Sequence, residues 1–294
     1  MGNYNLECVS PVKFNENEGV TMKLSCIPVS LYEDIFSGKK SVIDWIHFAH
    51  SLGLEGVDFS VKFFPNRDED ILNAISEKGQ KIGIEFCALA CYPDFTHPDP
   101  DQRALEIEQM KADVQLTAAL GAKYARVTAG QNHPGTDRTQ GIRWAVDGLR
   151  QVLDEADKLG ITLVYENHTK GAPWHYWDFS QPSDIFLEIL NSLADTTLKV
   201  CFDTANSLVL REDPIALLEA VIDRIAVVHV FDIRTPGEFE TVLVGTGASP
   251  IKQVFSILKR NGYDGWLSIE EASRTGEAGF EKAVPFVRRA WEEA

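Results

Sequence analysis

The chain has 294 residues, of which 44% are hydrophobic and 24% charged, and its net charge is −16. This acidic balance argues against a nucleic-acid partner, because phosphate contacts require clustered lysine and arginine. The sequence contains no apolar run of about eighteen residues that would span a membrane, and residues 1–20 show no secretory signal, so we expect a cytosolic protein without a membrane partner. The length suits two ordinary domains or one large α/β barrel.

In chain order, eight short apolar runs predict strands, at 22–29, 55–60, 81–89, 123–129, 161–166, 198–203, 225–231 and 266–271. Amphipathic helical stretches separate them, such as 139–160, where Gly160 occupies a C-cap position, and 212–224, where Pro214 lies near a helix start. This alternation predicts one (β/α)₈ TIM barrel over 21–294, with 1–20 as an N-terminal extension. An open doubly wound sheet is the alternative, but no GxGxxG follows the first strand.

The connections between these elements differ in length. Connections from helix to strand are short, whereas those from strand to helix are long and polar, at 90–101, 129–138, 167–182 and 232–249. Barrel enzymes place their sites on the face that follows the strand C-termini. We therefore expect the site on that face.

Four predicted strands carry, at or near their ends, a polar residue of a type that binds metal ions. These residues are Glu166, Asp203, His229 and Glu270. Each one alone would more often be a solvated acid or a core histidine. In a closed barrel, however, the ends of strands five to eight converge, and three carboxylates would repel one another without a cation. We therefore predict one divalent metal ion, with Mn, Mg, Co or Zn as the candidates.

The motifs VYENH, CFDTAN, VVHVFD and WLSIEE resemble those of the xylose isomerase-like TIM barrels, a superfamily of sugar phosphate isomerases and epimerases, apurinic endonucleases and dehydratases. The resemblance covers about residues 22–290. It implies that the four residues above are metal ligands and that His168 contacts substrate. Asn206 and Ala172 stand where ketose 3-epimerases of the family have His and Glu, which argues against a strict ketose 3-epimerase. Asn206 and the missing Asp-x-His after His229 argue against an endonuclease.

Other polar and aromatic residues on the same face are candidates for substrate contact. Asp232 and Arg234 would hold substrate oxygens, or form a salt bridge inside their loop. Trp174 belongs to an aromatic group that would cover the site and stack on a sugar, or form a small core of its own loop. Asn206 is a further candidate for contact with substrate.

These expectations lead to a metal-dependent isomerase or epimerase of a sugar or related polyol. Proton transfer would pass through a metal-stabilised enediolate, with Glu166 and Glu270 as the catalytic carboxylates. A dehydratase of a keto-polyol or keto-cyclitol would use the same site, and an endonuclease or a non-catalytic sugar-binding barrel is less favoured. The expected partner is a small sugar or polyol. The sequence leaves open whether the substrate carries phosphate, and also the oligomeric state.

Overall fold

Eight parallel strands form one sheet in the order β1-β8-β7-β6-β5-β4-β3-β2, in a computed structural model that describes residues 22–171 and 173–294. The strands are Lys23–Ile27 (β1), Gly56–Ser60 (β2), Glu85–Ala90 (β3), Tyr124–Val127 (β4), Thr162–Glu166 (β5), Lys199–Asp203 (β6), Ile225–Val230 (β7) and Trp266–Glu270 (β8). The Glu55 amide, just before β2, donates to the Leu24 carbonyl of β1 (3.1 Å) and links the two ends of the sheet. The predicted extension 1–20 and Ala172 lie outside the described residues.

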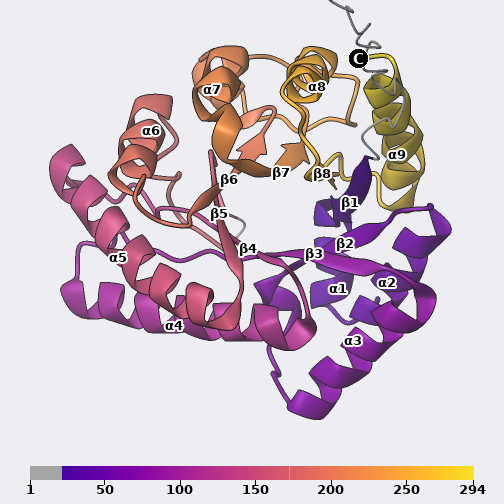
Figure 1. The fold of residues 1–294 in the computed structure, drawn as a ribbon, viewed down its shortest axis with the longest axis horizontal. Helices are drawn as coiled ribbons and strands as arrows, with labels where there is room; N and C mark the ends of the chain where they lie inside the picture. The colour runs from indigo at the N-terminus through magenta and orange to yellow at the C-terminus, as the bar shows by residue number, and fades with distance from the viewer. Residues whose placement is uncertain (1–21, 172) are drawn as a thin grey trace, which may run out of the picture.

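Helices surround the strands, as Figure 1 shows. They are Tyr32–Phe36 (α1), Val42–Ser51 (α2), Glu69–Ile82 (α3), Pro100–Leu120 (α4), Arg138–Leu159 (α5), Ser183–Ser192 (α6), Pro214–Val221 (α7), Ile251–Arg260 (α8) and Glu277–Glu292 (α9). The (β/α)₈ TIM barrel predicted from the sequence is confirmed. Within the two described ranges, no helix has the length and apolarity needed to cross a membrane.

Local signals explain where the helices begin and end. The Asp137 side chain accepts from the Gln140 amide at the start of α5, and Gly160 follows its last residue in the left-handed region (φ 69°). Pro214 is the first residue of α7, where its missing N–H has no intrahelical partner to lose. One predicted strand was too long at its start: Lys81 and Ile82 belong to α3, because Gly83 (φ 75°) ends that helix.

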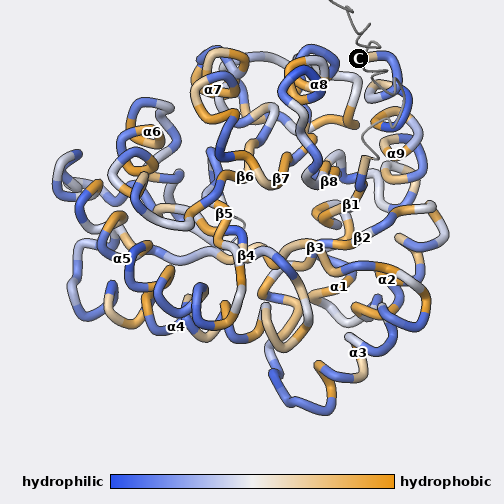
Figure 2. The backbone as a smooth tube through the Cα atoms, viewed as in Figure 1, coloured by the Kyte–Doolittle hydropathy of each residue, from blue (hydrophilic) through white to orange (hydrophobic). Residues whose placement is uncertain are grey.

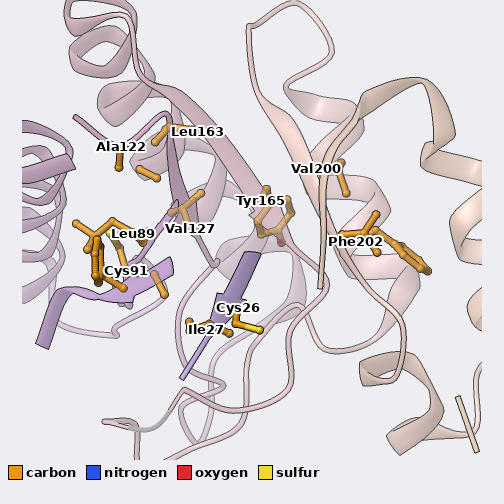
Figure 3. Packing of buried hydrophobic residues seen from close by; sticks show 14 of the residues in the cluster. Cys26, Ile27, Leu89, Cys91, Ala122, Val127, Leu163, Tyr165, Val200 and Phe202 are labelled. Atoms are coloured by element: carbon orange, nitrogen blue, oxygen red, sulfur yellow. Dashed lines mark hydrogen bonds between the residues drawn. The ribbon is translucent and has the colours of Figure 1, made fainter. Parts of the chain in front are cut away.

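The side chains along each strand point alternately into two apolar layers. One layer packs between the strands and the helices, and Figure 3 shows part of it, with Leu163 and Tyr165 of β5 and Val200 and Phe202 of β6. The other layer fills the inside of the barrel and includes Val164. Figure 2 shows the apolar strands beside helices that alternate between polar and apolar stretches. Because side chains alternate along a strand, Glu166 shares its direction with Val164 and faces the barrel interior.

Truncating a side chain in the layer between strands and helices should lower the free energy of unfolding. Phe202 is fully buried there, so Phe202→Ala should lower the free energy of unfolding by about 3–5 kcal/mol through lost burial and the cavity that remains. Leu105, which is 63% exposed on α4, is the control, and Leu105→Ala should change that free energy by no more than about 0.5 kcal/mol. Urea unfolding followed by circular dichroism measures both, and equal effects would contradict the layer assignment.

Candidate metal centre

Four side chains from consecutive strands converge at the carboxyl end of the barrel. Glu166, Asp203 and Glu270 are the last residues of β5, β6 and β8, and His229 is the penultimate residue of β7. Each offers one oxygen or nitrogen atom, and these atoms all lie within 4.8 Å of one another. The structure thus brings together the four residues that the sequence singled out.

His229 lies between two of the carboxylates. Its Nδ1 is 2.6 Å from Glu166 Oε1 and 3.2 Å from Glu270 Oε2. Burial by itself lowers the pKa of His229, but Cys201 and Glu166 outweigh that effect and raise this pKa well above its usual value. The imidazole therefore lies in a strongly negative environment.

Asp203 presents one oxygen to the cluster and uses the other to shape the backbone. Its Oδ1 accepts from the amides of Ala205 (2.8 Å) and Asn206 (2.7 Å), whereas its buried Oδ2 has no hydrogen-bond partner among the described residues. The Asn167 side chain fixes the Asp203 backbone by accepting from its amide and donating to its carbonyl. Burial and the carboxylates of Glu270 and Glu166 raise the pKa of Asp203 well above its usual value.

Arg126 is a member of the site that the sequence reasoning missed. Its guanidinium is buried on β4, with Nε 3.2 Å from Glu166 Oε2, Nη1 donating to the Cys91 carbonyl (3.1 Å) and the ring of Tyr92 4.6 Å away. Burial raises the pKa of Glu166, but the charges of His229 and Arg126 outweigh that effect and lower it to about 2. An arginine inside the apolar run KYARVTA was the signal, since buried arginines are rare unless paired.

The donor set fits a divalent cation. Three carboxylates and one imidazole supply hard oxygen ligands and one nitrogen, the chemistry expected for Mn, Mg, Co or Zn. Buried Asp203 Oδ2 lacks a hydrogen bond within the described residues, and Glu166 Oε2 has only its ion pair with Arg126 Nε at 3.2 Å. Such oxygens are costly unless a cation or donor meets them. The residues present therefore suit a metal ion at this position.

Three further predicted residues lie around this cluster. His168 Nδ1 is 3.3 Å from Asp178 Oδ2, and the His168 ring meets Trp174 edge to face at 5.6 Å. Trp174 is buried and donates from Nε1 to the Tyr92 carbonyl (3.3 Å). Asn206 is buried, and its Oδ1 accepts from the Thr169 hydroxyl. Substrate contact by these three residues stays a prediction.

Asp232 and Arg234 make their observed contacts within the loop after β7. The Asp232 carboxylate is buried and accepts from the amides of Gly245, Gly247 and Ser249 at 2.8–3.0 Å. Arg234 is exposed, and its Nε pairs with Glu240 Oε1 at 2.7 Å. The loop contains a salt bridge, but it joins Arg234 to Glu240 and does not involve Asp232, and neither predicted residue joins the four-residue cluster. Substrate binding by either one stays a prediction.

Comparison with known proteins agrees with this architecture. A family model described as the xylose isomerase-like TIM barrel matches residues 46–290. The chain is 25% identical over 265 residues to the L-ribulose-5-phosphate 3-epimerase UlaE of Escherichia coli (strain K12), a match that covers 85% of this chain and 89% of the relative.

Two solved structures extend the comparison. A D-tagatose 3-epimerase-like protein superposes with a TM-score of 0.76 at 16% identity, over 92% of this chain and 99% of that one. The IOLI protein, whose structure holds a zinc atom, superposes with a TM-score of 0.72 at 18% identity, over 92% and 97% of the two chains. At these identities the likeness shows the fold.

The buried pair of Arg126 and Glu166 makes a testable contribution to stability. Arg126→Met would leave the Glu166 carboxylate with less compensation in a buried position, and breaking such a pair costs about 3–5 kcal/mol of unfolding free energy. Arg150→Met removes a solvent-exposed pair with Asp195 and should change stability little. Chemical unfolding of both variants measures the difference, and equal stabilities would show that Arg126 does not support Glu166.

Proposed function

Since this chain belongs to the xylose isomerase-like TIM barrel family, we propose that it is a divalent-metal-dependent isomerase or epimerase of a sugar or related polyol. The proposal draws on the relatives whose names describe sugar epimerases and on the donor set at the end of β5–β8. The observation that carries it is the unequal exposure of the cluster. The Glu270 side chain is 24% exposed, whereas those of Glu166 and His229 are 1% and 2% exposed.

The metal would be held by the four clustered residues. A bound divalent ion would polarise a substrate carbonyl and stabilise the negative charge that develops on its oxygen. Asp203 would present its free Oδ2, and the ion pair with Arg126 would hold the Glu166 carboxylate in place. The proposed metal is Mn, Mg, Co or Zn. We also propose that the protein is cytosolic and does not bind nucleic acid.

The proton would move through Glu270. Because its carboxylate is the accessible one beside buried Glu166, it would take the proton from the carbon next to the carbonyl and, in an isomerisation, return it to the neighbouring carbon of the enediolate. An epimerisation would need a proton delivered to the opposite face of the enediolate, and Glu166 is the second carboxylate expected to supply it. His229 and Arg126 stabilise the charged form of Glu166 and lower its pKa to about 2, so this carboxylate would give up a proton readily. His168, Asn206 and Trp174 would contact the sugar around this centre.

Metal binding can be measured directly. The purified protein should carry or take up about one divalent ion per chain, and chelation should lower its melting temperature, because the ion binds the folded state. Asp203→Asn should remove most of this uptake. Asp184→Asn, at an exposed position on α6, should not. Elemental analysis before and after metal soaking measures the content, and its absence in both samples would contradict the site.

The route of the hydrogen distinguishes proton transfer from a hydride shift. Turnover in D₂O should place deuterium on the carbon next to the carbonyl, because a proton held on Glu270 exchanges with water before it is returned. Glu270→Gln should abolish the exchange, once its metal content is shown to be retained. A metal-supplemented screen of ketoses, aldoses and keto-cyclitols, read by NMR, would supply the substrate. Complete conversion without deuterium would contradict the base, and a product with a conjugated carbonyl would indicate a dehydratase.

A further inference from the structure

Two adjoining hollows lie on the loop face of the barrel. The smaller one, of about 310 Å³, is lined by Phe36, Ser60, Lys62, Tyr92 and Pro173. The larger one, of about 890 Å³, extends between the loops after β2–β5 and helix α4. Lys62, Tyr92 and Pro173 line both hollows, so the two adjoin one another, and together they are here called the α4 groove.

The α4 groove begins close to the metal centre. Tyr92, in its wall, lies 4.6 Å from the guanidinium of Arg126, which in turn contacts Glu166. Trp174, also in its wall, meets the ring of His168 edge to face. The four clustered residues do not line the hollows themselves, so a molecule whose reacting carbon lies beside Glu270 would reach the groove past Tyr92 and Trp174. Pockets that bury drug-sized ligands have volumes of roughly 300–1,000 Å³, so the larger hollow by itself is wide enough for another sugar ring.

Charges inside the α4 groove are largely compensated. Asp113 pairs with Arg67 (2.5 Å), and Asp94 accepts from Gln131 and lies 2.7 Å from His133 Nε2. Within the described residues, neither Lys62 nor Glu106 of the lining has an ion-pair partner, and Glu106 accepts from the Asp94 amide and the Gln102 side chain. The lining thus combines compensated charges and side-chain amides with the aromatic rings of Tyr92 and Trp174. Such a surface suits a neutral molecule with many hydroxyl groups better than a dianion.

A second observation argues against a phosphorylated substrate. TIM barrels frequently bind phosphate at the loops after strands seven and eight. In this chain the corresponding amides of Gly245, Gly247 and Ser249 donate to the Asp232 carboxylate. A Cβ on Gly247 would collide with the Ile233 carbonyl and Asp232 Oδ1, so this glycine lies directly against the carboxylate at the edge of a hollow of about 350 Å³. The chain's own anion occupies these donors and would repel a phosphate group.

We propose that the substrate is a neutral disaccharide in which a ketose with a free carbonyl carries a second sugar on one of its hydroxyl groups, with the ketose at the metal centre and the second ring in the larger hollow of the α4 groove. The inference rests on the proposed function for the reacting sugar. Beyond the proposed function, the inference specifies that the substrate has two sugar rings and no net charge. Ala112 and Gln102, which line the larger hollow and take no part in the metal centre, provide the means to test it.

Binding to the metal-supplemented protein tests the proposal without requiring turnover. The probes are fructose, fructose 6-phosphate and four glucosyl-fructoses that differ in linkage: turanose, maltulose, leucrose and isomaltulose. At least one disaccharide should bind about tenfold more tightly than fructose, a gain of about 1.4 kcal/mol, and fructose 6-phosphate should gain nothing. Calorimetry or saturation-transfer NMR measures each affinity. Disaccharides that bind no better than fructose, or a clear preference for the phosphate, would overturn the proposal.

Two variants locate the second ring. Ala112→Phe adds bulk to the larger hollow, and Gln102→Leu removes an amide from its wall, so each should reduce the disaccharide's affinity toward that of fructose while leaving fructose binding unchanged. Circular dichroism confirms folding, and Gln102→Leu provides the test if Ala112→Phe does not fold. Unchanged disaccharide affinity in the folded variants would overturn the placement. Disaccharide binding without any solvent exchange would instead support the groove and contradict the proposed reaction.

Discussion

Repulsion among three carboxylates at the carboxyl end of the barrel is the constraint on which the rest of the site depends. Glu166 and Asp203 are fully buried, and Glu270 lies against the same imidazole as Glu166. Buried like charges at such distances are tolerated only with positive compensation. Within the described residues, Arg126 supplies one positive charge from β4. The three carboxylates and His229 lie close enough together to bind a divalent cation, which would supply more.

Strand alternation delivers these groups to one place. In β5 to β8, apolar side chains with the same direction as the four donors fill the inside of the barrel below them, and the intervening residues pack against the helices. A shift of one residue in any of these strands would turn its donor into the apolar layer. The packing of the core and the position of the metal centre are therefore consequences of a single pattern.

The loops at the carboxyl end of the barrel differ in structure: some are held together by buried carboxylates, and others line a groove. Asp232 organises the loop after β7 by accepting three backbone amides, and Asp203 does the same for the turn after β6. On the opposite side, the loops after β2–β5 leave a large groove against α4. The loop after β7 thus leaves a hollow of about 350 Å³ whose amides are already bonded to Asp232, whereas the larger hollow of about 890 Å³ lies on the side of α4.

The barrel and the four clustered donors followed from the sequence itself, because periodic apolar runs and polar strand ends depend on local order along the chain. The partner of each polar group did not, because partners come from strands and loops far apart in the sequence. Arg126 reads as an isolated charge in an apolar run until β4 and β5 lie side by side. Likewise, the backbone amides that donate to Asp232 are 13 to 17 residues away along the chain and meet that carboxylate only when the loop after β7 folds. The α4 groove has no signature in the sequence, since its walls come from four loops and one helix.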